Sequence, residues 1–520
     1  MTKYLLILLF IFLFSLPLFA QEVDTAWVRR YNGPVDWAED VALAIAVDNS
    51  GNVYVTGYSS QNNTVPFNYD YTTIKYLPNG DTGWVRRYTG PVDSSDAARS
   101  IALDGSGNIY VTGFSWGSGT FADYTTIKYY PHGDTAWVRR YDGPGNGSDE
   151  ALALVTDGAG NIYVTGTSFD SATSNDYATI KYYPNGDTAW VRRYNGPTDS
   201  VDVAVAIAID GSGNVYVTGD SRISSADRDY ATIKYDSSGN ELWVRRYNGP
   251  GNSIDWGNDL AIDSSGNVYV TGLSIGSGSS FDYATIKYYP NGDAAWIRRY
   301  TGPGNQIDRA NALSLDGSGN ICVTGYSYDS STSRDYTTIK YYPNGDTAWM
   351  RKYDGQDIYS PLDEANAIAV DGSDNIYVTG FITVSGAYPP DRSYATVKYS
   401  PNGNELWVVR YDGPGFYEDR AQALAIDGTG NVYVTGSSPG VATGNDYGTI
   451  KYLQFLRGDA NSDQQLNVTD VIYLINYLFK NGPAPDPLKT ANANCDGQVN
   501  VTDVIYLVNY LFKGGPKPAC

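Results

Sequence analysis

The chain has 520 residues, 42% of them hydrophobic and 18% charged, so it carries enough apolar side chains to bury a large core. Gly (56) and Tyr (47) are abundant whereas Met (2), His (1) and Cys (3) are scarce, which favours short β-strands joined by glycine-rich turns. The net charge of −21 excludes nucleic acid as a partner, and a single histidine excludes a multi-histidine zinc site and most histidine-based catalysis.

Residues 1–20 have the pattern of a secretory signal peptide. Lys3 is followed by an apolar run from Tyr4 to Phe14, and Ala20 is the small residue after which we expect cleavage. The apolar run is short for a membrane span, and no stop-transfer pattern follows it. We therefore expect a protein that is secreted or associated with the cell surface, with no membrane span after cleavage.

A unit of about 53 residues recurs along most of the chain after the signal peptide. It carries three marks: Trp-x-x-Arg-Tyr, Asn-x-Tyr-Val-Thr-Gly and Tyr-x-Thr-Ile-Lys-Tyr. Each occurs eight times, with one substituted copy apiece at Lys352, Cys322 and Val397. The tryptophans of the first mark are Trp27, Trp84, Trp137, Trp190, Trp243, Trp296, Trp349 and Trp407.

One unit contains four strand signals, which in the first complete unit are residues 42–47, 53–57, 71–76 and 84–88. Four short strands per unit match one blade of a β-propeller; a β-solenoid, whose repeats are usually shorter, is the alternative. The first strand after the signal peptide is a fourth strand (27–31), and the last unit stops after its third (447–452). We therefore expect the N-terminal strand to complete the last blade and close a ring of eight.

The runs Asp-Gly-Ser-Gly-Asn-Ile-Tyr-Val-Thr-Gly and Asp-Tyr-x-Thr-Ile-Lys-Tyr resemble the bacterial SBBP β-propeller repeat and, more distantly, the NHL-type repeat. The resemblance covers residues 21–455. It implies a fold rather than a reaction, because propellers carry many unrelated functions.

A residue present in every blade most simply serves the blade. Eight aspartates recur at one position, where they form either a carboxylate ring around the channel or, as we expect, acceptors for backbone N–H groups at a strand entry. The arginine pairs, such as Arg29 and Arg30, are expected to bind carboxylates of neighbouring blades. The eight aspartates are Asp40, Asp96, Asp149, Asp202, Asp255, Asp308, Asp363 and Asp419.

The connections from the second to the third strand, and from the fourth strand to the next blade, vary in length and must lie on one face. We call it the variable-loop face. Trp37, Trp116 and Trp256 lie outside the repeated tryptophan position and within these connections. They are predicted to bind a polysaccharide or protein ligand by stacking; the alternative is that they cap the ends of the blades.

After residue 456 helical periodicity replaces strand alternation, and residues 467–483 recur as 500–516. An acidic loop precedes each copy, and its oxygen ligands have the spacing that a hard cation such as Ca²⁺ requires. Two Ca²⁺ ions are expected, the second bound more weakly because Asn492 removes one formal charge. The predicted ligands are Asp459, Asn461, Asp463, Gln465, Asn467 and Asp470 in the first loop, and Asn492, Asn494, Asp496, Gln498, Asn500 and Asp503 in the second.

Two such loop–helix units resemble a type I dockerin domain over residues 458–520. The resemblance implies calcium-dependent binding to a cohesin, with Val468–Thr469 and Val501–Thr502 as the recognition pairs. The alternative is a pair of calcium loops that only stabilise a small domain.

The three cysteines follow this division of the chain. Cys322 replaces a strand tyrosine and is expected to be a buried free thiol. Cys495 and Cys520 both lie in the last module and are predicted to form a disulfide that closes it.

The predicted fold is an all-β, eight-bladed β-propeller followed by a small α-helical dockerin with paired calcium loops. The predicted function is a secreted, non-catalytic binding or scaffold protein, anchored by its dockerin to a cohesin-bearing extracellular assembly concerned with polysaccharide. The alternative is a polysaccharide-degrading enzyme, a glycoside hydrolase or lyase, with its site on the variable-loop face. Hydrolysis requires two carboxylates at a defined separation, and the sequence does not bring any two together.

Overall fold

The computed structural model describes residues 22–62, 68–224, 227–329, 334–355, 362–385, 391–415, 418–463, 465–516 and 518. The chain divides into two compact units, one comprising Thr25–Leu453 and the other containing Gln454–Cys520. Neither α-helix of the described part has the length and apolar character needed to cross a membrane. The predicted signal peptide, residues 1–20, lies outside the described residues.

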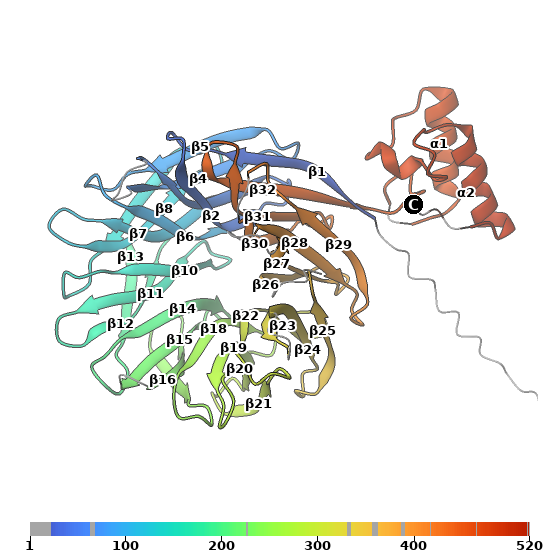
Figure 1. Cartoon of the computed structure of the whole chain (residues 1–520). Coiled ribbons are helices and arrows are strands. Elements are labelled where there is room, and N and C mark those ends of the chain that lie inside the picture. The colour runs from blue at the N-terminus through green and yellow to red at the C-terminus, as the bar shows by residue number, and fades with distance from the viewer. Residues whose placement is uncertain are drawn as a thin grey trace, which may run out of the picture. The chain divides into compact units, whose positions relative to one another are not determined.

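The first unit is a β-propeller of antiparallel, four-stranded blades, which Figure 1 shows arranged around one axis. Blade 1 consists of β2 (Ala38–Val47), β3 (Val53–Ser60), β4 (Tyr69–Tyr76) and β5 (Thr82–Tyr88). Blade 8 consists of β30 (Arg420–Ile426), β31 (Val432–Gly440), β32 (Gly444–Phe455) and β1 (Glu22–Tyr31).

Blades 2 to 7 repeat the order of blade 1. Their strands are, in blade 2, β6 (Asp96–Leu103), β7 (Ile109–Trp116), β8 (Ala122–Tyr129) and β9 (Thr135–Tyr141); in blade 3, β10 (Glu150–Thr156), β11 (Ile162–Asp170), β12 (Ser174–Tyr182) and β13 (Thr188–Tyr194); in blade 4, β14 (Asp202–Ile209), β15 (Val215–Ser224), β16 (Asp227–Tyr235) and β17 (Glu241–Tyr247); in blade 5, β18 (Asp255–Ile262), β19 (Val268–Ile275), β20 (Phe281–Tyr288) and β21 (Ala294–Tyr300); in blade 6, β22 (Asp308–Leu315), β23 (Ile321–Tyr328), β24 (Arg334–Tyr341) and β25 (Thr347–Tyr353); in blade 7, β26 (Glu364–Val370), β27 (Ile376–Ser385), β28 (Asp391–Tyr399) and β29 (Glu405–Tyr411).

The ring closes through the N-terminal strand. β1 pairs with β32, so strands from the two ends of the propeller sequence share blade 8. Arg30 on β1 forms an ion pair of 2.8 Å with Asp446 on β32, and the indole N–H of Trp27 donates to the Pro78 carbonyl of blade 1 at 3.1 Å. The predicted closure is therefore confirmed.

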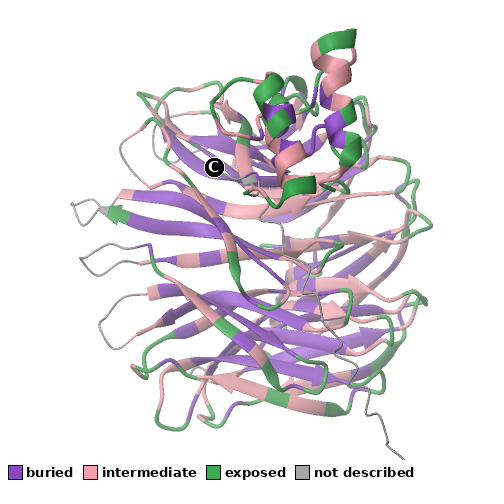
Figure 2. Ribbon diagram, turned by 90° about the vertical axis from the view of Figure 1, so that its right-hand side faces the viewer, coloured by how far each residue is buried: buried purple, intermediate pink, exposed green. Residues whose placement is uncertain are grey.

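The repeated side chains hold neighbouring blades together. Tyr71 of blade 1 donates to the Thr125 carbonyl of blade 2 at 3.0 Å, and Lys75 and Trp84 both donate to the Pro131 carbonyl of that blade. Around them, aromatic rings of one blade pack on aliphatic residues of the next. Figure 2 shows the result as buried strand centres with more exposed turns. The sequence marks are thus signatures of the seams between blades.

The two arginines of each pair have different partners. Arg29 donates from Nε to the Gly80 carbonyl of the next blade at 2.6 Å and lies over the ring of Trp27. Arg30 binds Asp446 within its own blade. The expectation that these arginines bind carboxylates of neighbouring blades holds in two blades, where Arg86 lies 3.7 Å from Asp134 and Arg298 lies 3.9 Å from Asp346. In both blades the closer acceptor across the seam is a backbone carbonyl, as it is for Arg29.

The seam between blades 7 and 8 gives independent evidence for the closure. The third and fourth strands of blade 8 come from opposite ends of the propeller sequence, so no turn connects them. The acceptors that such a turn supplies elsewhere are therefore missing. In accordance with this, Val409 stands where the other blades have the first arginine, and among the described residues the Trp407 indole N–H has no hydrogen-bond partner.

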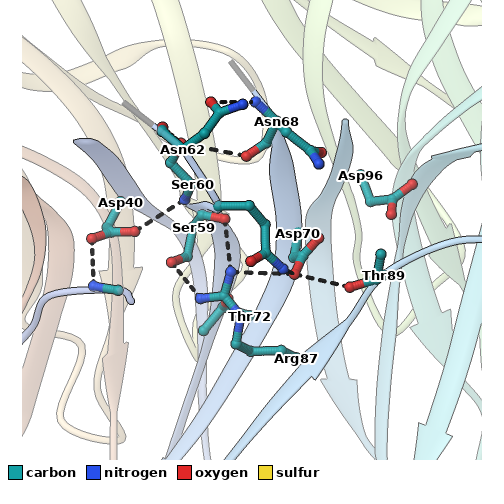
Figure 3. Close-up of polar contacts among 12 residues, drawn as sticks. Asp40, Ser59, Ser60, Asn62, Asn68, Asp70, Thr72, Arg87, Thr89 and Asp96 are labelled. Atoms are coloured by element: carbon teal, nitrogen blue, oxygen red, sulfur yellow. Dashed lines mark hydrogen bonds and ion pairs between the residues drawn. The ribbon is translucent and has the colours of Figure 1, made fainter. Parts of the chain in front are cut away.

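The eight recurring aspartates connect loops of the variable-loop face. Each accepts a hydrogen bond of 2.5–2.8 Å from the backbone N–H of the glycine after the preceding outer strand. Six of them also accept a backbone N–H from the end of the second strand, as Asp40 does from Ser60 (Figure 3). All eight are at most 1% exposed. The expectation that they accept backbone hydrogen bonds is confirmed.

These carboxyls predict an unusual pH dependence of stability. Burial raises the pKa of Asp96, Asp202 and Asp255 to about 6, and that of Asp363 and Asp419 to about 7. A raised pKa means that protonation favours the folded state. The contribution of these carboxyls to the stability of the propeller is therefore complete below about pH 4 and is lost as the pH rises through 6 to 7.

We therefore expect the melting temperature of the propeller to rise by several degrees when the pH falls from 8 to 5. Differential scanning calorimetry across this range checks it. Repeating the series in 0.5 M NaCl separates the buried carboxyls from the net charge of −21, since salt screens only the exposed charges. If the melting temperature decreases in both series when the pH is lowered from 8 to 5, the prediction is wrong.

The second unit contains the helices α1 (Val468–Lys480) and α2 (Val501–Lys513) and the short 3₁₀ helix η1 (Leu488–Ala491). Val471 and Leu474 of α1 pack with Val504 and Leu507 of α2 in one small core. Both α-helices begin with the same capping box. The side chains of Asn467 and Asn500 accept the N–H of the third helical residue, whose aspartate accepts the cap N–H in return.

Candidate calcium centre and ligand-binding face

The first acidic loop brings three carboxylates together. Asp459, Asp463 and Asp470 each place an oxygen within 4.8 Å of the other two. Backbone N–H groups shape the loop around them: that of Asp463 donates to Asp459 at 3.0 Å, and that of Asn461 donates to Asp470 at 3.3 Å. The N–H of Gln465 donates to Asp463. Three of the six predicted ligands of this loop, its carboxylates, therefore converge.

The second loop repeats this arrangement. The N–H of Asn494 donates to Asp503 at 3.2 Å, and the N–H groups of Asp496 and Gln498 donate to Asn494 and Asp496. Oδ1 of Asn492, the first predicted ligand, is buried and has no hydrogen-bond partner within the described residues.

Both loops fit a calcium ion. Burial, together with the charges of Asp459 and Asp463, raises the pKa of Asp470 to about 6, and a divalent cation among these oxygens relieves their repulsion. In the second loop a cation supplies the partner that the buried oxygen of Asn492 lacks. All of the donor atoms are oxygens, which is the ligand class of Ca²⁺.

The predicted partner residues are accessible. Val468 and Val501 are each 48% exposed, and Thr469 and Thr502 beside them are also exposed. Further along each helix, Ile472 and Phe479 on α1 and their counterparts Ile505 and Phe512 on α2 are exposed to similar extents. The duplicated sequence therefore presents the same apolar surface twice, and this surface extends beyond the first turn of each helix, where the recognition pairs lie.

The cysteines lie as the sequence indicated, as far as the structure describes them. Cys322 is buried and free, and burial raises the pKa of its thiol to about 12. Cys495 is disulfide-bonded, while its predicted partner, Cys520, lies outside the described residues.

The three predicted ligand-binding tryptophans lie on three different blades. Trp116 packs on Phe121 at a ring distance of 5.8 Å, and the guanidinium of Arg228 lies 5.3 Å from the ring of Trp256. Both indoles are partly buried, which agrees with the alternative that they cap blade ends. Trp37 differs, because it is 67% exposed.

Trp37 lines a cavity of 410 Å³ between blades 8 and 1 on the variable-loop face. Glu39, Glu418 and Arg420 also line it. Sequence reasoning missed these charged residues, because they flank the recurring aspartates Asp40 and Asp419 and come from opposite ends of the propeller. Each occurs at a position that varies from blade to blade, and this variation is the signal that could have found them.

Two families match parts of the chain. Residues 27–63, 84–119, 189–224 and 242–278 match the SBBP β-propeller repeat, and residues 457–512 match the type I dockerin domain. Both resemblances drawn from the sequence are thereby confirmed.

The individual relatives are distant. An uncharacterised WD repeat-containing protein of Acanthamoeba polyphaga mimivirus is 24% identical over 458 residues, which cover 72% of this chain and 32% of that protein. The chain thus spans less than a third of the length of that relative.

Similar solved structures include a protein of unknown function from Dyadobacter fermentans, with 9% identity and a TM-score of 0.40 over 83% of this chain and 98% of that one. PorZ, a surface component of the type-IX secretion system of Porphyromonas gingivalis, has 12% identity and a TM-score of 0.39 over 81% of this chain and 57% of its own. Likeness at this level supports no inference about function.

Proposed function

Since this chain carries SBBP β-propeller repeats and a C-terminal type I dockerin domain, we propose that it is an extracellular, non-catalytic binding protein concerned with polysaccharide. A type I dockerin domain implies calcium-dependent binding to a cohesin in an extracellular assembly. In this proposal two Ca²⁺ ions order the dockerin, the dockerin attaches the chain to a cohesin, and the propeller presents its variable-loop face to a glycan.

The observation that carries the proposal is the duplicated calcium loop with an exposed apolar helix face beside it. A cation that closes each loop holds the start of the following helix, because Asn467 and Asp470, and likewise Asn500 and Asp503, belong to both the loop and the cap. Calcium binding therefore prepares the surface that starts at Val468 and Val501.

The duplication predicts how changes at this surface combine. We expect the double change Val468→Asp and Thr469→Asp to leave most cohesin binding intact, because α2 offers an equivalent surface at Val501 and Thr502. Changing both pairs is expected to weaken binding by a factor of about 100 or more, since apolar anchors dominate such interfaces. Surface plasmon resonance on an immobilised type I cohesin measures both.

A control change on the propeller, Leu242→Asp, alters an exposed apolar residue of comparable size outside the dockerin and should leave cohesin binding unchanged. If the single-helix change alone abolishes binding, the two surfaces are not equivalent and this part of the proposal is wrong.

The alternative function, polysaccharide hydrolysis or lysis, has one observation in its favour: Glu39 and Glu418 line the same cavity. Hydrolysis by a carboxylate pair requires one of the two to donate a proton. Both carboxylate oxygens of Glu418 are already engaged, Oε1 with Arg392 at 2.6 Å and Oε2 with Arg420 at 2.5 Å, so neither is free to contact a glycosidic oxygen. The arrangement therefore supports binding over catalysis.

A further inference from the structure

The cavity beside Trp37 lies where the ring closes. The start of β2 runs parallel to the start of β32, with Ala38 opposite Gly444 and Glu39 opposite Asn445. The N–H of Trp37 donates to the Thr443 carbonyl at 2.9 Å, which fixes the backbone beneath the indole. At 410 Å³ the cavity is within the usual range for small-molecule sites.

Trp37 occupies an additional residue of its loop. Gly33 precedes Asp40 by seven residues, whereas the corresponding glycine precedes its aspartate by six in six of the other blades. Trp37 also has a φ of 63°, a left-handed conformation that is rare for a bulky side chain and costs about 1 kcal/mol or more. Because the indole is mostly exposed, its burial offsets little of this cost. Stacking of a ligand on the exposed ring would supply the missing contacts.

Three charged residues line the cavity, the carboxylates Glu39 and Glu418 and the guanidinium of Arg420. Glu418 is bound by Arg420 and also by Arg392, which does not line the cavity, so neither guanidinium is left unpaired to receive a carboxylate from a ligand. Glu39 accepts the Tyr69 hydroxyl at 3.0 Å and forms no ion pair within the described residues. The charged residues of the lining therefore sum to −1, and the exposed carboxylate of Glu39 opposes an anionic ligand.

We propose that this cavity binds one uncharged pyranose unit of a glycan, with the ring stacked on Trp37 and its hydroxyls donating to Glu39 and to the side chain of Asn445. An aromatic plane beside carboxylate and amide acceptors matches a sugar ring, which has an apolar C–H face and a rim of hydroxyl donors. This inference rests on the proposed function and names its ligand class and site.

Titration calorimetry of the full chain tests it, with cellohexaose, xylohexaose, mannohexaose and chitohexaose as uncharged probes and hexagalacturonate as the anionic one. We expect at least one uncharged probe to bind and hexagalacturonate to bind at least tenfold more weakly. Trp37→Asn should lower the affinity for the probe that binds by about tenfold or more, because it removes the ring while asparagine tolerates the left-handed backbone. Trp37→Tyr keeps an aromatic face and should retain most of the binding.

Three results overturn the inference: no uncharged probe binds, hexagalacturonate binds as tightly as the best uncharged probe, or Trp37→Asn leaves the affinity unchanged. Trp256→Ala, which removes a tryptophan on another blade, distinguishes glycan binding elsewhere on the variable-loop face from binding in the cavity at Trp37. If this variant weakens glycan binding and Trp37→Asn does not, the proposal that the variable-loop face binds a glycan is supported, and the proposed site at Trp37 is wrong. Calcium-dependent cohesin binding of the same protein reports on the dockerin independently.

Discussion

Removal of residues 22–34 is expected to destabilise the propeller more than any other change of similar size. It deletes β1, and with it the outer strand of blade 8, the buried indole of Trp27 and the ion pair between Arg30 and Asp446. Loss of a buried tryptophan alone costs about 3–5 kcal/mol, which is a large fraction of the usual stability of a domain. We expect a markedly lower melting temperature and rapid proteolysis within blade 8, both measurable on the truncated protein.

Two controls make this result specific to closure. A synthetic peptide of residues 22–34 added to the truncated protein should restore part of the lost stability. Trp27→Ala should also destabilise more than Trp407→Ala, because both indoles are equally buried but only that of Trp27 donates across a seam. If the truncated protein melts at the same temperature as the full chain, β1 does not close the ring.

Removal of calcium is expected to unfold the helical module while the propeller stays folded. Without a cation the three carboxylates of the first loop repel one another, and both helix caps depend on aspartates of the loops. Hydrogen–deuterium exchange of the full chain, in excess calcium and in excess EGTA, should show fast exchange of α1 and α2 only in EGTA. The propeller strands should exchange equally slowly in both.

The two loops are expected to differ in their contributions. Asp459→Ala removes a charged ligand from a loop with three carboxylates and should lower calcium affinity at least tenfold, more than Asn492→Ala in the second loop does. Calcium titration of the two variants compares them directly. Slow exchange of both helices in EGTA contradicts the calcium-dependent fold of the module, and an equal loss in the two variants contradicts the ranking of the sites.

The fold could be predicted from the sequence because each blade repeats the same marks. The phase of the repeats, with a fourth strand first and a third strand last, was sufficient to predict closure. The substitution of Val409 for arginine carries the same information, but its meaning depends on which turn accepts that arginine across the seam. The partners of Arg29 were mispredicted for this reason, since the sequence does not show that the acceptor is a backbone carbonyl.

The two acidic loops could also be predicted, because the proposed calcium ligands of each lie within twelve residues of one another. The cavity at Trp37 could not, because Glu39 and Glu418 meet only after the ring has closed. The exposure of Trp37 and its left-handed backbone depend on one additional residue in a loop, whereas Trp116 and Trp256 have the same composition signal and are partly buried. Composition alone does not distinguish a ligand-binding aromatic from one that caps a blade.

Calcium is expected to order the C-terminal module for attachment to a cohesin, and the cohesin binding of the full chain measures this. The full chain is passed over an immobilised type I cohesin in millimolar calcium, in excess EGTA, and again after calcium is restored. We predict binding in the first condition, loss of at least about 100-fold in affinity in the second, and recovery in the third. Equal binding in calcium and EGTA, or no binding in calcium, would contradict the account.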